Sequence, residues 1–246
     1  MMIQDKDLEF LQYCTNPDLF DLCNIITTYG NCKFNGKDNL QNENKRCDAN
    51  YLRDICRDIA VELRRYGGNK FLNKCRHGQG PSYRSIVSDV CKKMEVKGVK
   101  WRDSVEDMEH KLLSHVMGKM VEKLSAAEVE QMMNDLKIKK RSYRKQGIMA
   151  ALLIAGDFQF VLHAFQYISR VMTTKFAGDA AMMMGLGVLS NAAKLFFGPL
   201  GWVLCGAWTA WNMAGPTYKV TVPAVLQVAY MRMKYNAVYE KYAKHI

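Results

Sequence analysis

The chain has 246 residues, of which 49% are hydrophobic and 24% charged, and its formal net charge is +11. A chain of this length forms one large domain or two small ones with a substantial core. A nucleic acid is not expected as a partner, because nucleic-acid-binding proteins spread their basic residues over a folded face with aromatic residues between them. Here the basic excess is concentrated beside an apolar region.

Charged residues are divided unevenly along the chain. Residues 1–146 hold 48 of the 59 charged side chains, whereas Gly147–Met231 holds six. Up to Asp135 there are 21 basic and 21 acidic residues, so the positive excess begins after it. A compositional shift of this kind marks a domain boundary. The six cations just before the apolar region are Lys137, Lys139, Lys140, Arg141, Arg144 and Lys145.

The first predicted elements in chain order are helices. The segment "DLEFLQYC" places Leu8 and Leu11 at helical spacing, and "TNPDLFDLCNII" restarts a helix with Pro17 in its first turn. The polar, asparagine-rich segment 29–47 is then predicted to be a mobile loop. We expect residues 1–46 to form a short N-terminal helical domain with this loop.

Residues 47–146 are predicted to form a polar helical domain. Asp48 is placed to cap a helix that ends in the glycine pair after Tyr66, and Ser82 is placed to cap the next one. Two further helices open with capping-box patterns, at Ser104 and at Ser125. Apart from "YKVTV" near residue 220, which a proline follows, the chain shows no sustained alternation at period two. The sequence therefore predicts an all-α multi-helix bundle.

Residues 147–246 are predicted to form an apolar helical domain that contains a hairpin over 180–214. The first hairpin helix, Ala180–Phe197, is about 27 Å long, close to the thickness of a bilayer core. "GPLG" breaks the chain, and a second helix runs to Ala214. A third apolar helix is expected to begin near Pro223. Small residues at every fourth position of the second helix predict close helix packing: Gly206, Ala210 and Ala214.

The hairpin is compatible with two environments, a lipid surface or the core of the protein itself. Three tryptophans suit an interfacial belt but are equally common in a core, and Lys194 lies in a last helical turn from which its stem could reach an interface. Basic residues on both flanks would attract anionic lipid, or they are the ordinary charges of a solvated helix end. Those that follow the block are Arg232, Lys234, Lys241 and Lys244. The three tryptophans are Trp202, Trp208 and Trp211.

Motifs for enzymatic chemistry are missing. "GNCKFNGKD" does not match the spacing of a phosphate-binding loop, and "GLGVLS" lacks the third glycine of a dinucleotide-binding fingerprint. His110 and His115 are five residues apart and cannot bind one metal from one helical face. The eight cysteines contain no C-x-x-C pair, which favours reduced thiols in a cytosolic protein. We expect no enzymatic activity, no cofactor and no metal.

One glycine-rich turn is a candidate anion site. "CRHGQGPSYR" brings basic side chains to the start of a helix, where backbone N–H groups favour phosphate or carboxylate. The alternative is a simple connector whose glycines serve the turn. The basic residues concerned are Arg76, His77 and Arg84.

Four segments in the same order resemble the bacterial YaaW-like family: "DLEFLQYC", "YGGNKFLNKCR", "YRSIVSDVCKK" and "YKVTVPAVLQVAYMR". The resemblance covers most of the chain, and the last segment is the most specific. It implies a bacterial protein with a short N-terminal domain of unknown function and a region similar to ubiquinol-cytochrome c chaperones. It implies no catalytic residues.

These observations predict a non-enzymatic helical protein with a sequestered apolar hairpin. Its expected partner is an anionic membrane surface or an apolar protein, and the sequence is compatible with an oligomer. We expect it in the cytoplasm, with peripheral association at the inner membrane. The alternative is a soluble chaperone-like or partner-binding module in which the hairpin is only core.

Overall fold

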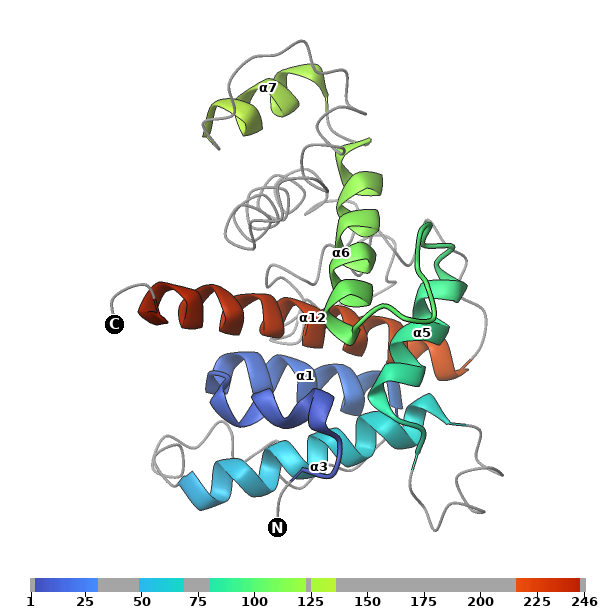
Figure 1. The fold of residues 1–246 in the computed structure, drawn as a ribbon, viewed down its shortest axis with the longest axis vertical. Helices are drawn as coiled ribbons and strands as arrows, with labels where there is room; N and C mark the ends of the chain where they lie inside the picture. The colour runs from blue at the N-terminus through green and yellow to red at the C-terminus, as the bar shows by residue number, and fades with distance from the viewer. Residues whose placement is uncertain (1–2, 31–48, 69–79, 123–124, 136–215, 244–246) are drawn as a thin grey trace, which may run out of the picture. The chain divides into compact units, whose positions relative to one another are not determined.

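The computed structural model describes residues 3–30, 49–68, 80–122, 125–135 and 216–243. These residues form helices joined by turns, with no strand among them, so the predicted all-α class is confirmed (Figure 1). The hairpin over 180–214 lies outside the described residues, as does the predicted mobile loop from residue 31 on; Tyr29 and Gly30, predicted to begin that loop, are the last residues of a helix. The elements are η1 (Lys6–Tyr13), α1 (Asn16–Gly30), α3 (Ala49–Gly67), α5 (Tyr83–Lys93), α6 (Val105–Val121), α7 (Ala126–Asp135) and α12 (Pro216–Ala243).

The chain divides into two compact units. The first unit combines Met1–His110 with Met213–Ile246, and the second is Lys111–Asn212. The first unit therefore joins the two ends of the sequence, with the start of α6 included. In the second unit the structure describes the rest of α6 and helix α7. The domain boundaries predicted at residues 46 and 146 stay predictions.

Helix α12 is the central helix of the first unit. It contacts η1, α1, α3 and α5, and α12, α1 and α3 lie side by side in Figure 1. All residues from Val220 to Met233 are buried, on every face of the helix. A helix that is apolar and enclosed all round belongs to the middle of a core rather than to its surface. Helices α1, α3 and α5 each contribute one buried stripe to this core, such as Ile59 and Leu63 of α3.

The start of α12 differs from the prediction. The helix begins at Pro216 and runs through Pro223, so "YKVTV" is helical. Pro216 stands at the first helical position, where the N–H that proline lacks would have no helical partner in any case. Pro223 does remove one backbone hydrogen bond from the interior. The burial of Val220, Val222 and their neighbours shows that tertiary packing outweighs this cost.

Two helix starts follow the predicted capping residues, Ser82 and Ser104, while Asp48 lies outside the described residues and the cap at Ser125 stays a prediction. The Ser82 side chain accepts a hydrogen bond from the N–H of Ser85 at the start of α5. At α6 the box is reciprocal: Ser104 Oγ accepts from the N–H of Asp107 at 3.0 Å, and the Asp107 carboxylate accepts from the N–H of Ser104 at 3.1 Å. Helix α3 ends at Gly67, as predicted.

A close backbone approach fixes the turn that precedes α5. A Cβ atom on Gly80 would lie 1.8 Å from the carbonyl oxygen of Arg64 in α3, so only glycine fits there. The Arg64 guanidinium donates hydrogen bonds to the carbonyls of Pro81 at 2.8 Å and Gly80 at 3.0 Å. The last turn of α3 thereby positions the N-terminus of α5.

Among the helices of the described ranges, none combines the length and the apolar character that a bilayer span requires.

Candidate functional site

Polar side chains of α12 bind residues of three other elements of the first unit, η1, α1 and α6. The Arg232 guanidinium donates through Nε to Glu109 Oε2 of α6 at 2.6 Å and through an Nη to the Asp7 carbonyl of η1. The central carbon of the guanidinium, Cζ, also lies 4.1 Å from the centroid of the Phe10 ring. Glu109 is 2% exposed and Arg232 8%. This is a buried ion pair supplemented by a backbone hydrogen bond and a ring contact.

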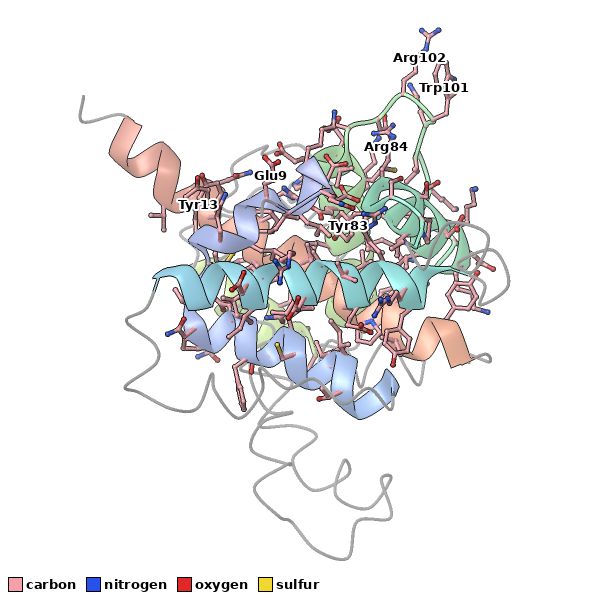
Figure 2. All side chains as sticks on the ribbon, turned by 90° about the horizontal axis from the view of Figure 1, so that it is seen from below. Glu9, Tyr13, Tyr83, Arg84, Trp101 and Arg102 are labelled. Carbon is pink, nitrogen blue, oxygen red and sulfur yellow. The ribbon has the colours of Figure 1, made fainter. Side chains whose placement is uncertain are left out.

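Tyr83, at the first position of α5, completes the network. Its hydroxyl donates to the other carboxylate oxygen, Glu109 Oε1, at 2.7 Å, and its side chain is fully buried. Burial, with the adjacent Glu109 charge, raises the pKa of Tyr83 well above its ordinary value, so the hydroxyl keeps its proton. We call Tyr83, Glu109 and Arg232 the buried triad; Figure 2 labels Tyr83.

Two opposing effects act on the charges of the triad. Burial raises the pKa of Glu109, while Arg232 and the hydrogen bonds to the carboxylate oppose that rise. Burial alone would lower the pKa of Arg232, but the Glu109 carboxylate together with the other acidic groups nearby more than offsets this effect, so the guanidinium stays charged. Each charge therefore depends on the other to remain ionised inside the unit.

The triad is suited to holding elements together rather than to acting on a substrate. A catalytic acid or base must lie within hydrogen-bond reach of its substrate. Here the carboxylate oxygens face the tyrosine hydroxyl and the guanidinium, and all three side chains are enclosed. What the arrangement does is connect η1, α5, α6 and α12 at one point.

A second polar contact holds α12 against α1. Lys234 Nζ lies 2.9 Å and 2.7 Å from the two carboxylate oxygens of Asp18, and Gln227 Nε2 donates to the Asp18 carbonyl at 3.3 Å. Thr15 donates its hydroxyl to the same carboxylate at 2.6 Å. Burial, together with the Asp18 charge, raises the pKa of the nearby Asp21 to about 6. Asp18 thus orients α12 along α1.

These contacts correct the prediction for two of the flanking cations. Arg232 and Lys234 were expected to lie with the basic residues that attract lipid, but both are paired with carboxylates of the first unit. The sequence shows cations that follow an apolar run, and this pattern does not distinguish solvated charges from paired ones.

Two cysteines, Cys14 and Cys56, lie beside η1, and the pKa of each thiol is raised. Cys56 Sγ lies 3.4 Å from the Leu11 carbonyl, and Cys14 Sγ 3.6 Å from the Phe10 carbonyl. Burial is the main cause that raises the pKa of each thiol to about 12. Among the described residues, no group of three or more His, Cys, Asp or Glu side chains is arranged to hold a metal ion.

The predicted membrane-contact and helix-packing residues lie outside the described residues, so those predictions stay open. This applies to the six cations of 137–145, to Lys194, to the tryptophans of the hairpin and to its small-residue ridge.

Of the predicted anion site, only Arg84 lies in a described range. Its Nη2 donates to the backbone carbonyls of Trp101 at 2.8 Å and Asp103 at 2.5 Å. The N–H of Tyr83, at the start of α5, donates to Asp5 Oδ2 at 2.7 Å. A carboxylate of the chain itself therefore occupies this helix N-terminus, and an external anion at the turn stays a prediction.

Sequence reasoning missed the buried triad and an exposed aromatic residue. Glu109 could have been found, because it lies on the face of α6 that carries the buried Val105 and Leu113, where an acid needs a partner. Trp101 is 81% exposed on the loop between α5 and α6, labelled in Figure 2. Exposure of a single tryptophan has no signature in the sequence.

Comparison with known proteins places the chain among uncharacterised bacterial proteins. Residues 2–30 match a domain of unknown function, DUF3944. The chain is 34% identical to a UPF0174 protein of Helicobacter pylori, over 94% of this chain and 92% of the relative. A UPF0174 protein of a second Helicobacter pylori strain is 31% identical, over 79% of this chain and 95% of the relative.

The YaaW resemblance is confirmed. The UPF0174 protein YaaW of Escherichia coli is 28% identical over 96% of this chain and 97% of its own length. The chaperone-like region implied by the resemblance stays a prediction. No solved structure matches the chain. On the similarity to the Helicobacter pylori proteins over nearly the whole chain, the protein belongs to the UPF0174 family.

Proposed function

We propose that this protein is a non-enzymatic helical protein that associates conditionally with the anionic, cytoplasmic face of a membrane through its apolar segment 180–214. An apolar protein partner is the alternative acceptor. In the sequestered form the protein's own residues cover the segment, and a trigger releases it to lipid.

The observation that carries this proposal is the burial of α12. The apolar segment ends immediately before Pro216, and fourteen consecutive residues of the helix that begins there are enclosed in the first unit. Arg232 and Lys234 hold this helix through ion pairs with two different helices. The apolar segment is therefore tethered at its C-terminal end to the most strongly held helix of a folded body.

Charge supports the membrane as the acceptor. Residues 137–145 contribute six cations ahead of the apolar region, and each basic residue near an anionic surface contributes about 1 kcal/mol of attraction. A segment that is tethered to a folded body and preceded by cations is suited to reversible insertion at an interface.

The test is flotation of the full-length protein with lipid vesicles. We expect it to float with vesicles that contain about one third phosphatidylglycerol and to stay at the bottom with phosphatidylcholine alone. Substituting Trp202→Ser together with Trp208→Ser should reduce flotation even at low salt, because the apolar contribution is lost.

A matched pair of variants separates the effect of charge. Lys140→Gln with Arg141→Gln should lower binding, whereas Arg57→Gln with Arg65→Gln removes two cations of α3 that are paired with acids on the same helix and should not. If the wild-type protein stays at the bottom with every vesicle composition, and melts cooperatively as a monodisperse species, the membrane proposal is wrong. The soluble partner-binding module then replaces it.

A further inference from the structure

Trp101 projects from the first unit into solvent. It lies at the tip of the loop 94–104, and Figure 2 shows Trp101 and Arg102 pointing away from the helices. At 81% it is more exposed than any other large hydrophobic side chain of the described residues. Tyr13, the next at 65%, stacks on Tyr235 with 5.7 Å between ring centroids. The Arg102 guanidinium lies over the Trp101 ring, 4.6 Å from its centroid.

The loop holds Trp101 outward by specific contacts. Arg84 Nη2 donates hydrogen bonds to the backbone carbonyls of Trp101 and Asp103, the residues before and after Arg102. The Asp103 carboxylate accepts from the N–H of Lys100 at 2.7 Å, and the Lys100 carbonyl accepts from the N–H of Asp103 at 3.1 Å. The base of the loop is anchored by Met94, whose side chain is fully buried. The exposed ring is therefore part of an ordered turn.

The chain on either side of Trp101 is rich in basic residues. Residues 92–103 carry five basic side chains and two acidic ones, Glu95 and Asp103, which leaves a net charge of +3. The basic side chains are Lys92, Lys93, Lys97, Lys100 and Arg102, of which all but Lys93 are exposed. A tryptophan beside lysine and arginine is the combination found at the level of lipid headgroups, where the ring enters the interface and the cations meet anionic phosphates.

The shape of the tip favours lipid over a protein partner. A stable protein interface buries about 800 Å² on each side around a cluster of apolar anchors. The flanking residues of this tip, Lys100 and Arg102, are charged and exposed, so one ring protrudes without an apolar patch around it. A single protruding ring cannot fill such an interface, but it can insert among lipid headgroups.

We propose that Trp101, with Lys97, Lys100 and Arg102, forms a second membrane contact that docks the folded first unit on anionic lipid. This inference rests on the proposed membrane association and adds the surface through which the folded body itself meets the headgroups. We call these four residues the tryptophan tip.

The experiment measures the fluorescence of Trp101 separately from that of the hairpin tryptophans. In the full-length variant Trp202→Phe/Trp208→Phe/Trp211→Phe, Trp101 is the remaining tryptophan. With phosphatidylglycerol-containing vesicles we expect its emission to shift to shorter wavelength and its quenching by iodide to fall. With phosphatidylcholine alone neither should change. The Trp101→Phe variant reports the hairpin tryptophans in the same assay.

Variants that lack the loop cations measure how much these charges contribute to vesicle binding. Each cation lost near an anionic surface lowers partitioning about fivefold, so Lys97→Gln/Lys100→Gln/Arg102→Gln should lower the vesicle partition coefficient about a hundredfold at low salt. The matched control Arg57→Gln/Arg65→Gln should leave it within about twofold. Circular dichroism of each variant checks that the helices persist.

The outcomes distinguish the two proposals. If Trp101 shifts while the hairpin tryptophans do not, the tryptophan tip is a lipid contact and the hairpin proposal is wrong. If the protein floats and the hairpin tryptophans shift, but the emission and quenching of Trp101 stay unchanged, the tip inference is overturned. A Trp101 that responds to neither vesicle but is shielded by a copurifying protein also overturns it, in favour of a protein partner.

Discussion

Replacing Arg232 with methionine removes the guanidinium that neutralises Glu109 inside the first unit. The carboxylate then keeps the Tyr83 hydroxyl as its partner in the triad and has no opposite charge. Breaking one side of a buried ion pair costs about 3–5 kcal/mol, because the remaining charge stays buried without compensation. The lost contact with the Phe10 ring adds about 0.5–1 kcal/mol. We therefore expect Arg232→Met to lower the free energy of unfolding by about 5 kcal/mol at pH 7.5.

The pH dependence of the stability deficit shows whether the unpaired charge of Glu109 causes it. Without Arg232, burial holds the pKa of Glu109 still further above its value of 4.5 in the unfolded chain. The stability contributed by the neutral carboxyl is complete below pH 4.5 and is lost as the pH rises through the folded pKa. The deficit of Arg232→Met should accordingly shrink between pH 7.5 and pH 5. The double variant Glu109→Gln/Arg232→Met should recover part of it at pH 7.5, since no charge is then left buried.

The assay is urea-induced unfolding of the full chain, followed by circular dichroism at both pH values. Arg57→Met is the matched control, because Arg57 is an arginine of α3 paired at the surface with Asp54 at 3.5 Å. Its removal should cost less than about 0.5 kcal/mol. An Arg232→Met deficit below about 1 kcal/mol, or one that is equal at both pH values, would refute the buried triad.

Three further predictions concern single side chains of the first unit. The pKa of Asp21 is about 6 in the folded protein and 3.8 in the unfolded reference, so ionisation of this carboxyl opposes folding. The stability that the neutral carboxyl contributes to the fold is lost as the pH rises through about 6. Asp21→Asn should then stabilise the protein by about 1 kcal/mol at pH 7.5, after allowance for partial exposure, and not at pH 4; equal gains in thermal melts at both pH values would contradict this. Ser104→Ala removes the cap of α6 and should cost about 1 kcal/mol, which thermal melting measures as a loss of about 2–4 °C. Cys56, with a pKa of about 12, should react with a disulfide reagent at pH 8 only after unfolding, and prompt labelling of the native protein would show that the thiol is accessible.

Local signals predicted the helices well because each acts over a few residues. Ser82, the Ser104–Asp107 box and Gly67 define helix ends through hydrogen bonds and backbone freedom that neighbouring residues supply. The first turn at Pro17 likewise needs no information from elsewhere in the chain. The all-α class follows from these signals together with helical spacing of apolar residues.

The sequence does not reveal the partners of charged residues that lie far apart along the chain. Arg232 and Glu109 are 123 residues apart, and Lys234 and Asp18 are 216 apart. Without knowledge of which helices pack together, Arg232 after an apolar run is indistinguishable from a solvated flanking charge. The sequence likewise does not reveal that Trp101 is exposed. Its loop is held by hydrogen bonds from Arg84 to two backbone carbonyls, and such contacts with the backbone leave no pattern in the sequence.

Because α12 lies at the centre of the first unit, the core of that unit cannot be completed until the end of the chain has been synthesised. Helices η1, α1, α3 and α5 leave the ribosome before all of Lys111–Asn212, whereas the helix that covers their apolar faces follows it. Helix α12 ends 150 residues after α5, so at bacterial elongation rates of about 5–20 residues per second those faces wait roughly 8–30 seconds for this helix. During this time the apolar faces of these helices have no α12 to pack against. A message cut short before Pro216 would yield helices without the centre around which they assemble.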